Sequence, residues 1–244
     1  DAFKNNTSQI AFAAGKDIAG KPIIADIAKM PHLLIAGATG SGKSTILSLI
    51  VRNYDIQKGE ILIDDIDIKK IDIKCLRNKI GQMLQDVFIF SGTILDNITL
   101  FDQTISLQDV NNAIKYVNAD KFILKMKDGL NTEVSEKGSN FSSGQRQLIS
   151  FSRTIVHNPQ ILILDEATAN IDTETEALIQ DSLEKMKNIG TMLIVAHRLS
   201  TIQHADNIIC LAKGKILEQG NHQQLLSKKG YYYKLYLLQF EKNI

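Results

Sequence analysis

Residues 37–45 read GATGSGKST, and this stretch decides the fold expected for the chain. It matches the phosphate-binding pattern G-x-x-x-x-G-K-[ST], whose glycines let backbone N–H groups close around phosphate oxygens. Lys43 is expected to reach the terminal phosphates, and the Ser44 hydroxyl is expected to bind Mg²⁺. The predicted nucleotide-binding loop is Gly37, Ala38, Thr39, Gly40, Ser41, Gly42, Lys43, Ser44 and Thr45.

The residues on either side of the loop supply the setting that this pattern requires. An apolar run at 32–36 leads into the loop as a buried strand, and residues 45–52 leave it at helical spacing. Two shorter apolar segments, 9–14 and 21–27, are joined by a glycine-containing turn and predict a hairpin. A hairpin, a buried strand, a glycine-rich loop and a helix predict an α/β fold of the P-loop NTPase class with an antiparallel β portion.

The composition limits the function. Lysine and arginine total 28 against 27 for aspartate and glutamate, so a net charge of +1 gives no general field for nucleic acid, and no nucleic-acid partner is expected. No apolar run approaches the roughly 18–20 residues that span a bilayer, so the chain is not expected to span a membrane. Cys75 and Cys210 form no metal-spaced cluster, which predicts two ordinary reduced thiols and a cytoplasmic location.

Downstream of the loop, predicted strands and helices alternate. Apolar or alternating runs predict strands at 60–68, 80–84, 160–164 and 191–196, followed by a hairpin at 207–218. Helical spacing occurs at 106–117, 120–126, 144–156 and 174–187. The expected single domain, 1–244, therefore has a front part at 1–44, a core at 45–91 and 157–244, and an α-helical subdomain at 92–156. The aromatic tail 231–240 is expected to be a core-packing helix.

Polar side chains follow the predicted buried strands, where phosphoryl chemistry needs a metal ligand, a positioned water and charge neutralisation. Asp165 can hold Mg²⁺, and Glu166 beside it can act as the general base for the attacking water. The Gln85 amide can bind Mg²⁺ and that water, and His197 can contact the γ-phosphate. Taken singly, Gln85 is more simply a surface glutamine and His197 a structural histidine.

Residues 141–145, FSSGQ, open the helix predicted at 144–156. Ser142, Gly144 and the first helical N–H groups form an anion site of the kind found at a helix N-terminus. By themselves these residues are more simply a helix cap, with Ser142 or Ser143 at the N-cap position.

Taken together and in this order, the motifs resemble the nucleotide-binding domain of ATP-binding cassette (ABC) transporters, from Thr45 to about Phe240. The likeness rests on the phosphate loop, Gln85, FSSGQ at 141–145, ILILDE at 161–166, ANID at 169–172 and AHRLST at 196–201. The phrases QDVFIFSGTILDNI (85–98) and LDEATANID (164–172) are similar to exporter-type cassettes. The usual signature is LSGGQ, and Ser143 in place of glycine implies a weaker contact with phosphate.

The resemblance implies an ATPase that binds ATP, with Mg²⁺ held at Ser44, Gln85 and Asp165. It implies an ATP-dependent head-to-tail homodimer, in which one copy contacts the γ-phosphate held by the other through Ser142, Gly144 and Gln145. It also implies a catalytic group made of Glu166 as base, His197 as γ-phosphate switch and Gln85, with Asp172 as a dimer contact. The surface near 85–98 is expected to receive the transmembrane domain of an ABC exporter.

Residues 8–44 depart from the exporter pattern. Their sequence, SQIAFAAGKDIAGKPIIADIAKMPHLLIAGATGSGKS, resembles the segment that enters the phosphate loop of FtsK-type DNA translocases, and this likeness stops after Ser44. It implies an engineered chimera joined inside the loop. Exporter cassettes stack adenine on an aromatic ring, worth about 1–3 kcal/mol. Here only Phe12 is near that position, so a weakened or altered base preference is expected.

Two alternatives to an exporter ATPase are left open by the sequence. A DNA-translocating motor is favoured by residues 8–44 and opposed by everything after Ser44, where no basic stripe is evident. A fold-hybrid that binds nucleotide without hydrolysing it is compatible with the same residues.

Overall fold

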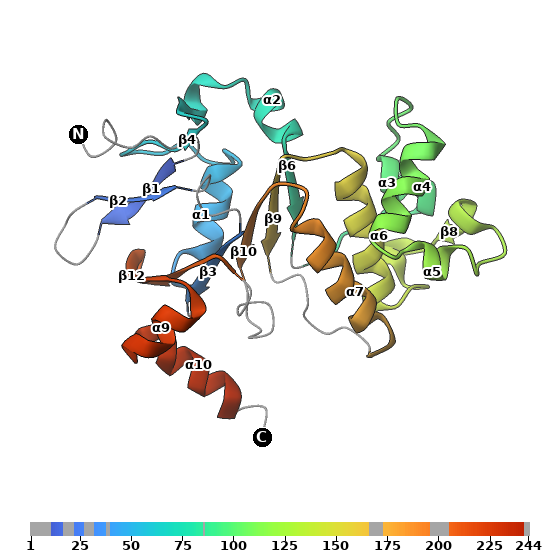
Figure 1. Ribbon diagram of the computed structural model, residues 1–244. Helices are drawn as coiled ribbons and strands as arrows, with labels where there is room; N and C mark the ends of the chain where they lie inside the picture. The colour runs from blue at the N-terminus through green and yellow to red at the C-terminus, as the bar shows by residue number, and fades with distance from the viewer. Residues whose placement is uncertain are drawn as a thin grey trace. The chain divides into compact units, whose positions relative to one another are not determined.

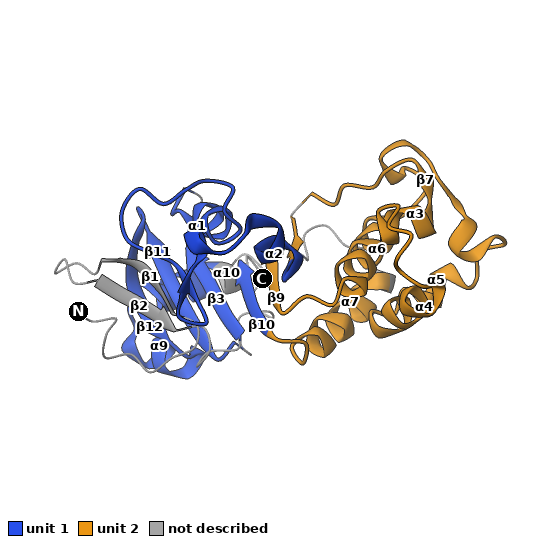
Figure 2. Ribbon diagram, turned by 90° about the horizontal axis from the view of Figure 1, so that it is seen from above, with its two compact units in different colours: residues 1–80, 191–244 blue, residues 81–190 orange. Residues whose placement is uncertain are grey.

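The computed structural model describes residues 11–16, 22–26, 32–37, 40–84, 86–165, 173–195 and 205–241 (Figure 1). It divides into two compact units, coloured in Figure 2: unit 1 comprises residues 1–80 and 191–244, and unit 2 comprises residues 81–190. The predicted helical subdomain, 92–156, lies within unit 2.

Unit 1 is built on parallel strands with β3 in the middle. β3 (His32–Gly37) lies between β10 (Thr191–Val195) and β11 (Asn207–Ala212), and both neighbours run parallel to it. β12 (Lys215–Gly220) returns antiparallel beside β11. Residues 33–36 of β3 are all buried, which explains why the sequence there is a continuous apolar run rather than an alternating one.

Two small antiparallel hairpins also belong to unit 1. β1 (Ala11–Lys16) pairs with β2 (Pro22–Asp26), which confirms the predicted hairpin before the loop. The single strand predicted at 60–68 is wrong: β4 (Leu62–Ile63) and β5 (Ile66–Asp67) pair with each other instead. Asp64 and Asp65 form the turn between them with φ of 49° and 62°, because aspartate tolerates this left-handed backbone.

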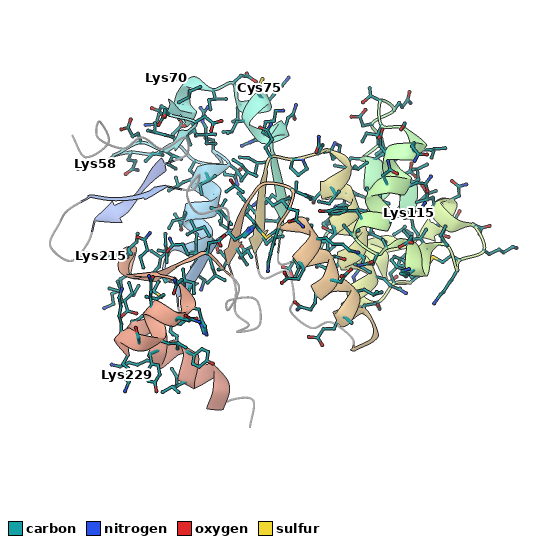
Figure 3. All side chains as sticks on the ribbon, in the orientation of Figure 1. Lys58, Lys70, Cys75, Lys115, Lys215 and Lys229 are labelled. Atoms are coloured by element: carbon teal, nitrogen blue, oxygen red, sulfur yellow. The ribbon has the colours of Figure 1, made fainter. Side chains whose placement is uncertain are left out.

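The helices of unit 1 flank these strands. They are α1 (Lys43–Ile50), η1 (Ile68–Lys70), α2 (Ile73–Asn78), α9 (His222–Lys228) and α10 (Tyr231–Glu241). The tail prediction holds for one side of α10 only, since Tyr232 is buried and bonded to His222 Nδ1 whereas Leu237 and Leu238 are exposed. Cys75 lies exposed on α2 (Figure 3), Cys210 is buried in β11, and both are free thiols as predicted.

Unit 2 combines two neighbouring strands with helices. β6 (Ile80–Met83) starts at its boundary and lies beside β9 (Ile161–Asp165). The α-helices are α3 (Ile94–Thr99), α4 (Leu107–Tyr116), α5 (Asp120–Ile123), α6 (Ser143–Val156) and α7 (Thr173–Met186). Single turns of 3-10 helix, η2 (Gly129–Asn131) and η3 (Glu136–Gly138), and a short pair, β7 (Gly92–Thr93) with β8 (Glu133–Val134), complete it.

α6 is the central helix of unit 2. It packs against α3, α4 and α7, and all of its residues from Gln147 to Ser152 are buried. The sequence predicted this helix from Gly144, one residue later than it begins. Within the described ranges, no helix is both long enough and apolar enough to cross a bilayer.

Candidate nucleotide-binding site

The phosphate loop leaves β3 at Gly37, where space admits only glycine. A Cβ atom at this position would lie 2.4 Å from the Leu211 carbonyl oxygen and 2.6 Å from Ser41 Oγ. Both distances are far below van der Waals contact, so any side chain would push the loop away from β11. Packing inside the protein therefore requires glycine at position 37, in addition to the close approach of the backbone to phosphate that the motif predicts.

The loop ends at the N-terminus of α1. Gly42 is the N-cap residue, with φ of 103°, and its carbonyl oxygen accepts the first helical hydrogen bond from Ile46 N at 3.1 Å. Because glycine has no side chain to cap the helix, the first N–H groups of α1 are oriented for an anion. This is the geometry expected of a phosphate site.

Lys43 lies within the loop rather than out in solvent. Its side chain is buried, and its Nζ atom donates a hydrogen bond to the carbonyl oxygen of Gly37. The ammonium group is thus held across the loop, between the end of β3 and the start of α1. A positive charge and helical N–H groups that converge on one place suit the triphosphate of a nucleotide.

A turn from another part of unit 1 supports the loop. Gly214, in the turn between β11 and β12, donates its backbone N–H to the Ser41 carbonyl oxygen at 2.9 Å. The Cβ position of Gly42 lies 3.7 Å from Gly214 Cα. Sequence reasoning missed this contact: the Lys213-Gly214 pair signals a hairpin turn, but only the pairing of β11 with β3 brings it to the loop.

The predicted Mg²⁺ ligands that the structure describes are oxygen donors. Ser44 is exposed in the first turn of α1 in unit 1, and Asp165 ends β9 in unit 2. Hydroxyl and carboxylate oxygens fit Mg²⁺, which is held by few protein groups together with substrate phosphates. Among the residues that the structure describes, no group of three or more His, Cys, Asp or Glu side chains could hold a metal ion.

The signature segment, residues 141–145, starts α6 in unit 2. Ser142 is the N-cap, as the plainer interpretation predicted: its Oγ accepts from Gln145 N at 3.2 Å, and its own N donates to Gln145 Oε1 at 3.0 Å. Ser142 is exposed and Gly144 is buried. All three predicted contact residues are thus gathered in one turn of helix.

The signature segment accommodates the aromatic side chain of Phe141 by burying it. Its ring is buried and meets Phe122 edge-on at 6.5 Å between ring centres. Its carbonyl oxygen accepts from Arg146 Nη1 at 2.6 Å, which fixes the backbone at the entrance to α6. The residue at this position acts as a core anchor for the exposed Ser142 that follows.

Several predicted positions fall outside the described residues. They are Ala38, Thr39, Gln85, Glu166, Asp172, His197 and the side chain of Phe12. Their roles stay predictions.

Comparison with known proteins shows the family. The family model described as ABC transporter matches residues 21–169. The probable multidrug resistance ABC transporter ATP-binding/permease protein YheH of Bacillus subtilis (strain 168) is 47% identical over 229 residues, which cover 94% of this chain and 34% of that protein. The putative ABC transporter ATP-binding protein exp8 of Streptococcus pneumoniae is 48% identical over 222 residues, 89% of this chain and 38% of that protein.

A solved structure described as a bacterial Atm1-family ABC exporter with ATP bound has the same fold. It matches with a TM-score of 0.82 and 36% identity, over 95% of this chain and 41% of that one. The chain spans roughly a third of the length of the curated relatives above.

These matches support neither of the two alternative functions, nor the fusion inferred from residues 8–44. The family match begins at residue 21, inside the segment that resembles translocases. Together with the glycine-lined loop between β3 and α1, they lead to one assignment: the chain belongs to the ABC transporter family, as an ATP-binding ATPase domain of exporter type.

Proposed function

We propose that this domain binds ATP with Mg²⁺ at the phosphate loop and hydrolyses it to ADP and phosphate. The observation that carries the proposal is the loop geometry: Gly37 has no room for a side chain, and Lys43 bridges back to the end of β3. Ser44, Asp165 and Gln85 are the protein groups proposed to hold Mg²⁺. When bound, the ion supplies positive charge against the charge that develops on the transferred phosphoryl group.

Glu166 is proposed as the catalytic base. It directly follows Asp165, the last residue of β9, so the chain places it just beyond a buried strand. A carboxylate at that point can accept a proton from the water that attacks the γ-phosphate, and the Gln85 amide can orient the same water. His197, two residues beyond β10, is proposed to donate a hydrogen bond to the γ-phosphate.

A second copy of the chain is proposed to complete each site. Ser142, Gly144 and Gln145 would approach the γ-phosphate held by the partner, with Asp172 at the contact between copies. The capping box of α6 bears on this step, because Ser142 and Gln145 already bond to each other. A hydrogen bond from Ser142 or Gln145 to phosphate therefore competes with the hydrogen bonds between these two residues. When ATP binds, bonds to phosphate would replace bonds within the capping box.

A transmembrane domain is the proposed partner, at the cytoplasmic face of a membrane. Relatives of this chain are described as ATP-binding/permease proteins and are about three times its length. The expected docking surface near 85–98 exposes aromatic side chains: Phe88 is 61% exposed and Phe90 43%. Exposed aromatic side chains of this kind are typical of a protein-binding site.

The base preference is proposed to be weaker or altered relative to other exporters, as the front segment predicts. Comparing ATP and GTP affinity between the native chain and Phe12→Ala checks this proposal. Unchanged affinities would remove Phe12 from the site.

Release of phosphate from Mg-ATP by the purified chain is the first test of function. Glu166→Gln should keep nucleotide binding, lose turnover by orders of magnitude and accumulate an ATP-bound dimer. Lys43→Met should lose binding as well, because it removes the only charge shown inside the described part of the loop. Lys215→Ala, an exposed lysine on β12, is the matched control. Full turnover by Glu166→Gln would refute the base assignment.

A further inference from the structure

Arg153 lies on α6, ten residues after Ser143, and binds a segment distant in sequence. Its Nε donates to the Asn97 carbonyl oxygen at 2.7 Å, and its Nη2 donates to Asn97 Oδ1 at 3.1 Å. Its Nη1 donates to the Phe88 carbonyl oxygen at 2.9 Å. The planar guanidinium thus makes three hydrogen bonds in a fixed fork, a geometry that the compact ammonium group of lysine cannot reproduce.

Asn97, which accepts two of these hydrogen bonds, is itself held in place by bonds to the backbone of the same segment. Its side chain is fully buried, and its amide pairs with both backbone groups of one residue: Nδ2 donates to Phe90 O and Oδ1 accepts from Phe90 N, each at 2.8 Å. Nδ2 also donates to Thr93 O at 3.0 Å. The segment 88–97 is therefore closed into a rigid loop whose inner face is held by Arg153.

The outer face of the same loop is exposed and apolar. Phe88 and Phe90 are 61% and 43% exposed, and their rings meet edge-on at 4.8 Å. The Arg153 guanidinium carbon lies 5.5 Å from the Phe90 ring centre, so the cation sits over the aromatic ring from inside. We call Arg153, Asn97, Phe88 and Phe90 the arginine clamp.

α6 connects this clamp to the signature segment. Residues 143 and 153 are about 15 Å apart along a helix that rises 1.5 Å per residue. α6 contacts α3, α4 and α7. The same continuous helix begins next to Ser142, includes Gly144 and carries Arg153, so it joins the Phe88–Phe90 surface to the signature segment.

We infer that Arg153 is a positioning residue, which fixes the exposed Phe88–Phe90 surface to α6 and thereby sets where Ser142 and Gly144 meet the nucleotide held by a second copy. The inference rests on the proposed function, since it assigns Arg153 a role in completing the shared site. Under this inference, a partner that binds the exposed Phe88 and Phe90 rings affects the position of the signature segment through Arg153.

The test measures ATPase activity of the native chain and of Arg153→Met over a range of protein concentrations, with nucleotide affinity measured separately on dilute protein. The concentration for half-maximal turnover should rise about tenfold or more, because Ser142 and Gly144 would no longer be held where they meet the nucleotide of the second copy. Nucleotide affinity of the dilute chain should be unchanged, because the phosphate loop lies in unit 1. Arg153→Lys should be intermediate.

Ser182→Ala separates positioning from stability. Ser182 is fully buried in unit 2, bonds to Val117 O and Leu178 O, and does not belong to the arginine clamp. It should lower Tm without moving the concentration dependence. If both variants shift that dependence in proportion to their loss of Tm, or if Arg153→Met behaves as the native chain, the inference is refuted.

Phe90→Leu keeps the test decisive if Arg153→Met does not fold. It leaves the Arg153 hydrogen bonds to backbone and Asn97 intact and removes only the ring, so a smaller shift in the same direction is expected. No shift with either Phe90→Leu or Arg153→Lys would overturn the inference. Absence of Mg-dependent turnover in the native chain at every concentration would instead refute the proposed function.

Discussion

Gly214 contributes to the nucleotide site without belonging to its motif. With φ of 71° it adopts a left-handed backbone, next to Lys213 at 50°, and this pair makes the tight turn of the β11–β12 hairpin. The same residue donates its N–H to Ser41 inside the phosphate loop. This hydrogen bond joins the hairpin turn to the phosphate loop.

Gly214→Ala should lower both stability and ATP affinity. A Cβ at Gly214 meets open space, so its cost comes from the left-handed backbone, about 1–2 kcal/mol. Gly129→Ala is the matched control, because Gly129 has φ of 52°, equally open space and a position in unit 2. Denaturant unfolding should give similar losses for both, whereas nucleotide titration should separate them. Equal ATP affinities would contradict support of the loop by Gly214.

The two cysteines should differ sharply in reactivity. Burial, together with the nearby Glu218 carboxylate, raises the pKa of the Cys210 thiol to about 12, whereas Cys75 is exposed. A thiol whose pKa is raised is protonated and unreactive at neutral pH. Alkylation of the native chain should therefore modify Cys75 alone, and Cys210 only after unfolding. Labelling of native Cys75→Ser would show that Cys210 is accessible.

At the scale of elements, α3, α4 and α6 of unit 2 each begin with a capping box, and α4 and α6 form a useful pair for comparison. α4 starts with a capping box between Ser106 and Asp109, and α6 starts with one between Ser142 and Gln145. Each satisfies orphan N–H groups at a helix start. Only the α6 box is placed in a segment proposed to meet a nucleotide, so the pair allows capping to be distinguished from binding.

Ser142→Ala and Ser106→Ala should each destabilise the chain by about 1 kcal/mol, the usual cost of losing a serine N-cap. Ser142→Ala should also reduce ATP turnover several-fold, because the hydroxyl is lost from the shared site. Thermal unfolding and phosphate release on both variants check this. Similar turnover in the two variants would restrict Ser142 to capping.

The elements predicted from periodicity agree with the structure where burial is uniform. Residues 32–36, 160–164 and 191–196 are apolar throughout and become β3, β9 and β10 to within a residue or two. The single strand predicted from the alternating run at 60–68 is wrong, because alternation of isoleucine and aspartate fits both a strand and a hairpin. The left-handed backbone of Asp64 and Asp65 makes this segment a hairpin, and such a backbone cannot be recognised from the spacing of apolar residues.

At the scale of the whole molecule, the central prediction is that each ATP is held by two copies. Lys43→Met removes the loop function and Gly144→Val removes the signature function, so each variant alone should be inactive. In a mixed dimer, one site combines the intact loop of one chain with the intact signature of the other. Random pairing in a symmetric dimer should then restore roughly a quarter of native activity.

Phosphate release after mixing the two variants in equal amounts measures this restoration. Each variant mixed with itself at the same total concentration is the control. Mixtures that form dimers yet stay inactive would contradict a site shared between copies.

The sequence by itself determined the family-level architecture and the chemistry. GATGSGKST between an apolar run and a helix specifies a phosphate loop, because glycine placement and strand burial are local properties. The order of the later motifs placed Asp165 at a strand end and Ser142 at a helix start, as the structure shows. These predictions agree with the structure because each depends on only a few adjacent residues.

Only the tertiary structure decided which distant residues support those motifs. Gly214 reaches Ser41 because β11 pairs beside β3, and Arg153 reaches Asn97 and Phe88 because α6 packs on α3. In the sequence, these are a hairpin glycine and a helical arginine like many others. Their roles arise from hydrogen bonds across more than fifty residues, and such contacts follow from how elements pack rather than from any local pattern.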